Sequence, residues 1–229
     1  SPFLEIEDTR AGEYNPVKFA RIDRLLALAE KYQLRIKFTL HHIRSISSGE
    51  VKQRWANSEV LAAANGGPFQ NIQEYISTAE GKAFYLMRAK ALADRYRDNR
   101  QIFAWELWNE MDAVHDKNWL PFSAEILDSV RQLFPHHLVT QTLGSMHSAD
   151  AADRYIAYYA LPNQPYVSIH RYIDPGHDWE QYAPVTYPVD RLVHEAMSFT
   201  QRYVKDKPIV INEIGAVEAN HAGPSKLYE

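Results

Sequence analysis

The chain has 229 residues, of which 45% are hydrophobic and 24% charged, and it contains no cysteine. This composition is typical of one globular domain, so residues 1–229 are expected to form a single domain. With 29 acidic against 25 basic side chains there is no basic stripe for nucleic acid, and no segment approaches the roughly 18 apolar residues of a membrane span. Neither nucleic acid nor a membrane is expected as a partner, while the lack of cysteine leaves a cytoplasmic and an exported bacterial location open.

Helices and strands alternate along the chain. In chain order, the apolar spacing predicts a helix at 15–33, a strand at 35–40, a helix at 72–96, a strand at 101–107, a helix at 119–133, a strand at 137–143, a helix at 149–160, a strand at 165–170, a helix at 188–204 and a strand at 208–212. The first helix has Asn15 as its cap and Pro16 at its first position. The segment Ile43–Asn71 is too long for a plain connection and indicates a functional loop.

Such alternation implies parallel strands joined by right-handed helical crossovers, either in an open doubly wound sheet or in an eight-stranded barrel. An open sheet that binds a nucleotide would carry a glycine-rich turn after its first strand, and none of the strand ends has one. Polar or titratable residues follow the strands instead, as in His41-His42, Asn109-Glu110, His170-Arg-Tyr172 and Glu213-Ile-Gly215. A (β/α)8 TIM-type barrel is therefore favoured, since its catalytic face lies at the carboxyl ends of the strands.

Two carboxylates stand out because each directly follows a hydrophobic strand. Glu110 ends the segment Trp105–Glu110, and Glu213 ends the segment Pro208–Glu213. Glycoside hydrolysis requires a facing pair of carboxyls, about 5–5.5 Å apart for retention and about 6.5–9.5 Å apart for inversion. The number of residues between Glu110 and Glu213 does not give the distance between their carboxyl groups.

With these residues in place, the sequence resembles a glycoside hydrolase of clan A, and in particular the family 5 group that includes cellulases and mannanases. The resemblance covers nearly the whole chain. It implies that Glu110, after Asn109 at the end of the fourth barrel strand, is the acid/base, and that Glu213 at the end of the seventh is the nucleophile. It implies a retaining β-glycosidase that acts by double displacement on a β-linked carbohydrate and needs no metal or organic cofactor.

The same resemblance implies substrate contacts for other side chains. It implies that Asn109 binds the sugar 2-hydroxyl and that Tyr172 lies beside the nucleophile. Hydrogen bonds from His170 and Tyr172 are expected to orient both carboxylates. His41 matches a histidine of the third strand, with His42 as the alternative.

Three tryptophans in predicted loops or at a helix start, Trp55, Trp119 and Trp179, are candidate platforms for sugar rings, with core or loop packing as the equal alternative. The buried-strand position of Glu106 suggests a structural carboxylate paired with a base. The histidines also admit a metal hydrolase, but adjacent His41 and His42 point to opposite sides of a strand, which disfavours a shared metal site.

The matched strands correspond to the third to the seventh of a barrel, so the barrel is expected to be incomplete. This leaves a second candidate function, a carbohydrate-binding or catalytically weak partial barrel. Open edges at the first and last strands would expose unpaired backbone groups, so a homo-oligomer that covers them is expected. The rival interpretation is a piece of a longer polypeptide.

Overall fold

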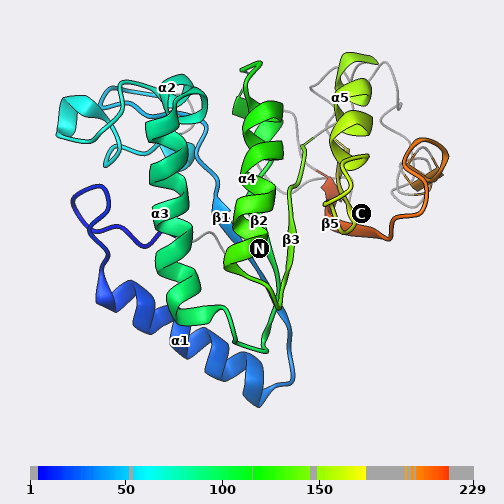
Figure 1. The fold of residues 1–229 in the computed structure, drawn as a ribbon, viewed down its shortest axis with the longest axis horizontal. Helices are drawn as coiled ribbons and strands as arrows, with labels where there is room; N and C mark the ends of the chain where they lie inside the picture. Colours follow the sequence, from blue (N-terminus) through cyan, green and yellow to red (C-terminus); the bar gives the residue numbers. More distant parts are fainter. Residues whose placement is uncertain are drawn as a thin grey trace. The chain divides into compact units, whose positions relative to one another are not determined.

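The computed structural model describes residues 5–51, 54–114, 116–144, 149–173, 194, 197–198 and 200–216. The chain divides into two compact units, Ser1–Gln141 and Thr142–Glu229. The helices and strands are α1 (Pro16–Lys31), β1 (Ile36–His41), α2 (Ile72–Ser77), α3 (Ala79–Tyr96), β2 (Ile102–Trp108), α4 (Trp119–Leu133), β3 (Leu138–Thr140), α5 (Ala149–Tyr159), β4 (Val167–Ile173) and β5 (Ile209–Ala216) (Figure 1). Among the described residues, three short 3-10 helices, η1 (Arg54–Ala56), η2 (Ala63–Asn65) and η3 (Met111–Val114), lie in the connections. The two units are described separately.

The first helix begins where its capping residues predict. The side chain of Asn15 accepts a hydrogen bond from the backbone N–H of Val17 at 2.8 Å, and Pro16 occupies the first turn. Proline suits this position because its missing N–H would have no helical partner. Helix α1 then buries Ile22, Leu26 and Ala29, which share one face.

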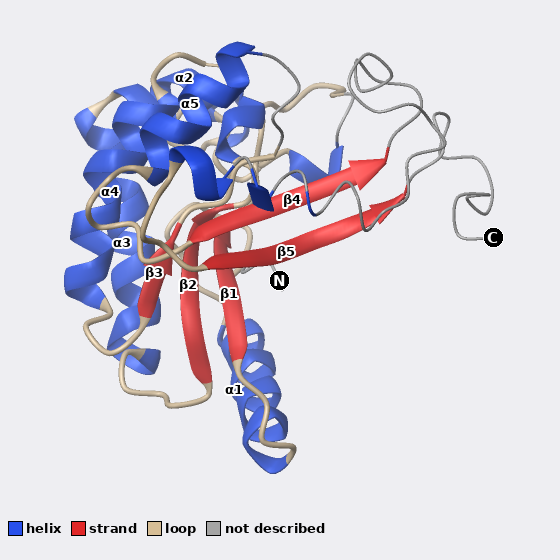
Figure 2. Cartoon of the chain, turned by 90° about the vertical axis from the view of Figure 1, so that its right-hand side faces the viewer, coloured by secondary structure: helices blue, strands red, loops and turns tan. Residues whose placement is uncertain are grey.

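The first unit contains a three-stranded parallel sheet in the order β1-β2-β3. Helices α3 and α4 lie side by side over one face of this sheet (Figures 1 and 2). Parallel strands need helical crossovers between them, and the alternation predicted from the sequence is confirmed here. The carboxyl ends of β1 and β2 consequently meet at the same edge of the sheet.

The expected helix over 72–96 is two helices, because Thr78 interrupts it. Thr78 has an extended backbone, with φ −102° and ψ 157°, and its hydroxyl accepts from the N–H of Gly81 at 3.1 Å. It thereby ends α2 and caps α3, which is a competing use of a hydroxyl side chain that helical periodicity does not reveal. Helix α2 packs on α3 at Gly81, where an added Cβ would lie 1.9 Å from the carbonyl oxygen of Tyr75.

Aromatic side chains form much of the core of the first unit. Trp105 on β2 is fully buried between Phe38 and Phe134, with ring centroids 5.5 and 4.3 Å away. Its indole N–H donates to Nδ1 of His137 at 3.1 Å. Trp105 is therefore a core residue.

Buried polar side chains connect β1 with β2. Glu106 is fully buried and accepts hydrogen bonds from Nζ of Lys37 at 2.8 Å and from Oγ1 of Thr39 at 2.5 Å. The prediction that Glu106 is a structural carboxylate paired with a base is confirmed. Because a buried carboxylate without partners is costly, these contacts also fix the register of the two strands.

The second unit holds a parallel pair of strands, β4 and β5, and the helix α5. The hydroxyl of Tyr159 on α5 donates to the carbonyl of Ser168 on β4 at 2.9 Å. Nζ of Lys207 donates to the carbonyls of Tyr159 and Leu161, which ties the segment before β5 to the end of α5. The helix expected at 188–204 falls mostly outside the described residues, although residues 200–203 are helical.

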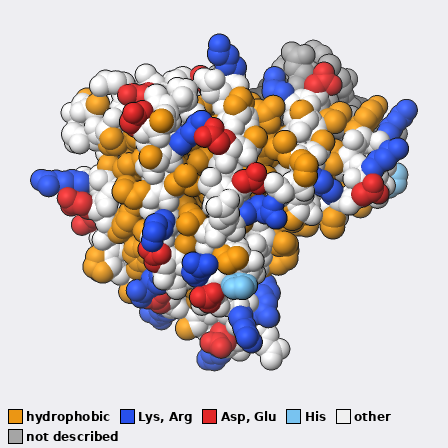
Figure 3. Space-filling model, in the orientation of Figure 1, with side chains coloured by type: hydrophobic (Ala, Val, Ile, Leu, Met, Phe, Trp, Pro, Cys, Tyr) orange, Lys and Arg blue, Asp and Glu red, His pale blue; other side chains and the backbone are white. Residues whose placement is uncertain are grey.

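The surface carries charges of both signs. Figure 3 shows acidic and basic side chains interspersed with apolar ones over α3 and α4, without a field of one sign. Within the described residues, no helix is long and apolar enough to cross a membrane.

Candidate active site

Glu110 lies two residues past the end of β2, in an uncommon backbone conformation. The N–H of Asn109 still donates to the carbonyl of His41 at 2.8 Å, which continues the pairing of β1 with β2 by one residue. Glu110 then adopts φ +50°, and the carbonyl of Glu110 accepts from the N–H of Ala113 to begin η3. A left-handed non-glycine residue at a strand end is typical of functional positions.

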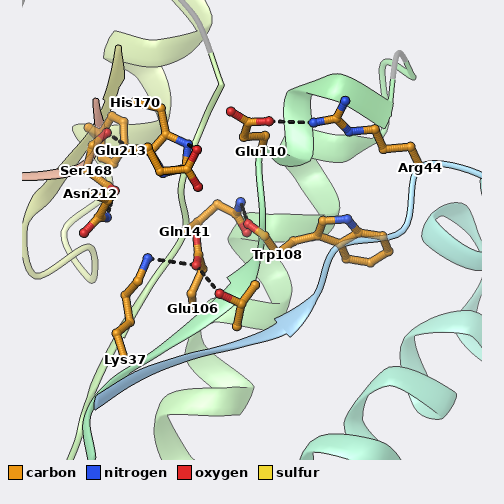
Figure 4. A network of polar contacts seen from close by, with 12 residues as sticks. Lys37, Arg44, Glu106, Trp108, Glu110, Gln141, Ser168, His170, Asn212 and Glu213 are labelled. Carbon is orange, nitrogen blue, oxygen red and sulfur yellow. Dashed lines mark hydrogen bonds and ion pairs between the residues drawn. The ribbon is translucent and has the colours of Figure 1, made fainter. Parts of the chain in front are cut away.

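The carboxylate of Glu110 is held by Arg44, which follows β1. Nη2 of Arg44 donates to Oε2 of Glu110 at 2.5 Å, and both side chains are 18% exposed (Figure 4). Beneath them the indole N–H of Trp108 donates to the carbonyl of Ile43 at 2.9 Å, and the amide of Gln141 donates to the carbonyl of Trp108. These bonds connect the ends of β1, β2 and β3 around the glutamate.

Trp55 lies on η1 in the long loop and is 54% exposed, which is high for so large an apolar side chain. Its ring is nearly parallel to that of His42, at 8° and 6.2 Å between centroids, and the guanidinium carbon of Arg44 lies 5.1 Å from its centroid. Nε2 of His42 also lies 3.1 Å from the carbonyl oxygen of Trp55. An exposed indole beside a guanidinium is an arrangement that can bind a sugar ring.

The two histidines at the end of β1 differ in their surroundings. His41 is buried among Tyr75, Tyr85 and Trp108, and its Nε2 lies 2.8 Å from the hydroxyl of Tyr75. Burial holds the pKa of His41 well below its ordinary value, with Arg88 and His42 adding to the effect. Burial also lowers the pKa of His42, against the opposing influence of Glu5. Both rings are therefore neutral near pH 7.

A cavity of about 150 Å³ opens beside these histidines in the first unit. His41, His42 and Asn57 line it together with the acidic Glu5 and Glu59. Polar groups that converge on a small cavity are suited to binding hydroxyls or water.

In the second unit, Glu213 lies on β5 directly opposite His170 on β4. Nδ1 of His170 lies 3.4 Å from Oε2 of Glu213, the His170 side chain is fully buried, and the Glu213 side chain is 29% exposed (Figure 4). The amide of the preceding Asn212 donates to the hydroxyl of Ser168. The cross-strand pair places the His170 imidazole beside one of the two carboxylates that it was expected to orient.

Other predicted site residues have different environments. Trp119 begins α4 and is only 4% exposed, a position typical of core packing. The backbone of Tyr172 pairs with Gly215, but its side chain lies outside the described residues, as does all of Trp179. These assignments stay predictions.

One histidine of the metal interpretation has a structural role in the core of the first unit. His137 accepts from the Trp105 indole through Nδ1 and lies 2.9 Å from the carbonyl of Asn99 through Nε2, so both ring nitrogens are used in the core. His115, His147 and His177 fall outside the described residues. Within either unit by itself, the described residues bring no three carboxylate or imidazole ligand atoms together.

Arg44 was not predicted from the sequence. It lies two residues past His42 in a segment whose turns and glycines indicate only a loop. The available signal was an arginine just beyond a strand end, in the region where a barrel places its site.

Comparison with known proteins identifies the family. The Cellulase (glycosyl hydrolase family 5) sequence model matches residues 5–228. The chain belongs to glycosyl hydrolase family 5. The predicted resemblance to this family is thereby confirmed, since the match extends over both carboxylates and nearly the whole chain.

Curated relatives of this family 5 chain include two plant proteins. Mannan endo-1,4-beta-mannosidase 7 of Arabidopsis thaliana is 23% identical over 232 residues, covering 89% of this chain and 51% of the relative. Mannan endo-1,4-beta-mannosidase 1 of Oryza sativa subsp. japonica is 24% identical over 191 residues, covering 71% and 42%. The chain thus spans about half the length of the curated relatives it matches.

Solved structures of family 5 enzymes share the fold. The endo-beta-1,4-mannanase of Thermotoga petrophila superposes with a TM-score of 0.65 at 16% identity, covering 92% of this chain and 48% of that one. A family 5 mannosidase of Rhizomucor miehei gives a TM-score of 0.63 at 16% identity, covering 99% and 59%. The prediction of an incomplete TIM-type barrel is confirmed, with five parallel-paired strands among the described residues.

Proposed function

We propose that this family 5 chain catalyses retaining hydrolysis of a β-linked glycan, with Glu213 as nucleophile and Glu110 as acid/base. The observation that carries the proposal is that both glutamates lie within a family 5 sequence, Glu110 two residues past the end of β2 and Glu213 on β5. Glycosidases of this type use one carboxyl as a proton donor and a second as the attacking carboxylate.

In the first step, Glu213 attacks the anomeric carbon while Glu110 gives its proton to the leaving oxygen. In the second step, Glu110 takes a proton from a water molecule whose oxygen attacks the anomeric carbon. The bond to Glu213 breaks, and the sugar is released with its original configuration. The imidazole of His170, next to Glu213, orients that carboxylate for attack. Asn109 and Tyr172 are proposed to bind sugar hydroxyls, and no metal or cofactor enters these steps.

For the substrate we propose β-1,4-linked mannan. The proposal draws on the names of the plant relatives, which are mannan endo-1,4-beta-mannosidases. Trp55, with its exposed ring beside Arg44, which in turn contacts Glu110, provides a surface on which a sugar ring can stack. We assign it to the leaving-group side, because Glu110 protonates the oxygen of that group.

The acid role of Glu110 predicts a dependence on the leaving group. Glu110→Gln is expected to lower kcat/KM for a 4-methylphenyl β-mannoside by about 10²-fold or more, because general acid catalysis contributes roughly 10²–10⁴-fold. From a dinitrophenyl β-mannoside, the dinitrophenolate leaves without needing a proton. With this substrate, kcat/KM of Glu110→Gln should therefore stay within about threefold of the wild-type value. Equal losses with both substrates would remove Glu110 from the acid role, and the matching glucosides would test the choice of sugar.

A second candidate function is a saccharide-binding partial barrel completed by another copy of the chain. Within the described residues, β1 pairs with β2 and forms one edge of the first unit's sheet. Strand edges with unpaired backbone groups favour association. Light scattering and activity measured over a range of chain concentrations test this candidate. A constant monomer mass with constant specific activity would exclude it.

A further inference from the structure

One guanidinium in the first unit contacts both the exposed tryptophan and the carboxylate after β2. Arg44 donates to Glu110 at 2.5 Å, and its guanidinium carbon lies 5.1 Å from the centroid of the Trp55 ring. At 18% exposure each, the two charged side chains are screened by solvent less than a surface ion pair. Trp55, by contrast, is 54% exposed.

The backbone keeps Arg44 beside the segment that carries Trp55. The N–H groups of Arg44 and Ser45 both donate to the carbonyl of Ala56, at 2.6 and 3.2 Å. Oγ of Ser45 donates to the side chain of Asn57 at 2.9 Å, next to a bridge between the same two residues. A displacement at Trp55 is therefore transmitted to Arg44 through few intervening atoms.

The ion pair conflicts with the proposed first step of catalysis. A guanidinium beside a carboxyl group favours its ionised form, whereas protonation of the leaving oxygen requires the protonated form. Arg44 must consequently be drawn away from Glu110 before the proton is transferred. Since Arg44 lies against Trp55, a ligand on that ring is well placed to do so.

We propose that Arg44 is a positioning residue that latches Glu110, and that a saccharide ring stacked on Trp55 releases the latch. A sugar ring offers an apolar face to the indole and hydroxyl oxygens at its edge, which accept hydrogen bonds from a guanidinium. Arg44 then donates to the sugar, and Glu110 takes up a proton from water. The inference rests on the proposed function for the role of Glu110, and it adds a saccharide unit of the leaving group as the ligand that opens the site.

A binding experiment tests the latch without turnover. Mannotetraose is titrated by calorimetry into variants that all carry Glu213→Ala, so that the ligand is not consumed. Because Glu110 competes with the saccharide for Arg44, Glu110→Gln should tighten binding by about fivefold, and Arg44→Met should weaken it by about fivefold or more. When both changes are combined, affinity should equal that of Arg44→Met, since no latch is left to release.

Arg54→Met is the matched control. Arg54 lies next to Trp55 on the same 3-10 helix, its side chain is 87% exposed, and it is 3.8 Å from Glu59. Its loss should leave the affinity unchanged. Arg44→Lys keeps the charge and should retain an intermediate affinity, and circular dichroism establishes that each variant is folded.

The proposal is overturned if Glu110→Gln leaves the affinity unchanged, or if it tightens binding equally with Arg44 present and absent. Failure of every variant to bind mannotetraose also overturns it. If the binding pattern is as expected but the unmodified chain hydrolyses no β-mannoside or β-glucoside, the proposed function fails and the binding latch stands.

Discussion

Glu110, the proposed acid/base, has a backbone conformation that disfavours a residue with a side chain. At φ +50° a side chain with a Cβ is strained by roughly 1–2 kcal/mol, whereas glycine is not. The neighbouring contacts that hold this conformation are the Asn109 N–H on the carbonyl of His41 and the Arg44 guanidinium on the carboxylate. The left-handed turn therefore holds the Glu110 carboxylate near the end of β2, and it lowers the stability of the fold.

Comparison of two substitutions isolates this strain. Glu110→Gly and Glu110→Ala both remove the ion pair with Arg44, but only glycine is free of the left-handed penalty. In urea titrations, the free energy of unfolding should be about 1 kcal/mol higher for Glu110→Gly than for Glu110→Ala. At most positions the alanine variant is the more stable of the two. An alanine variant as stable as the glycine variant would show that the conformation is not strained.

His41 predicts a dependence of stability on pH. Burial depresses the pKa of His41 in the folded chain well below its ordinary value of 6.5. Below pH 6.5 the unfolded chain therefore binds a proton that the folded chain does not, and the folded state loses stability as the pH falls. The loss attributable to His41 should approach about 1.4 kcal/mol for each pH unit below that value.

The measurement compares the free energy of unfolding at pH 7.5 and pH 5.5 in the wild type and in His41→Gln. The variant should lose about 1 kcal/mol less between these two values. The same substitution at His136, whose side chain is 70% exposed, is the control and should keep the wild-type difference. Identical losses in all three proteins would contradict a buried neutral His41.

At the scale of elements, the α2–α3 junction places Tyr75 against His41. An added Cβ at Gly81 would lie 1.9 Å from the carbonyl oxygen of Tyr75, so Gly81→Ala must separate the two helices. We expect it to lower the free energy of unfolding by about 1–3 kcal/mol, although alanine is the better helix former. At Gly49 the nearest atom to an added Cβ, the Ser47 hydroxyl, is 3.7 Å away, so Gly49→Ala should change stability by less than about 0.5 kcal/mol. Equal effects at both glycines would refute the close approach.

The elements themselves were largely predictable because apolar periodicity and capping residues are local properties of the sequence. The amphipathic pattern and Asn15-Pro16 predict α1, and α4 has the predicted bounds of 119–133. The break at Thr78 was not predicted, since an extended hydroxyl residue within an apolar pattern looks helical. Strand β3 is shorter than expected because pairing with β2 extends only over Leu138–Thr140.

Prediction of the site was limited in a different way. Glu110 and Glu213 could be proposed because each follows an apolar strand, and His170 because it also lies on a strand that ends near them in a barrel. The role of Arg44 and the φ of Glu110 depend on contacts between segments more than 60 residues apart. The 2.5 Å hydrogen bond from Arg44 to Glu110, for example, joins residues that are 66 positions apart in the sequence. No local pattern encodes such a contact.

At the scale of the whole molecule, family 5 membership rests on a match from residue 5 to residue 228 that includes both units. The chain covers about half of its curated relatives, and the solved family structures are correspondingly longer. The assignment of a single domain over residues 1–229 and the association of copies are both proposals at this scale. Both proposals concern how the site of a barrel is completed. The chemistry proposed for Glu110 and Glu213 can be tested independently of these two proposals.

The most direct test of that chemistry is chemical rescue of the nucleophile. Glu213→Ala should lose turnover of an aryl β-mannoside, and added azide should restore part of it by entering the vacated position, with the α-mannosyl azide as product identified by NMR. Inversion in the rescued variant, against retention in the wild type, is the expected result. Full activity of Glu213→Ala, or a wild-type product of inverted configuration, would contradict the retaining mechanism proposed for this chain.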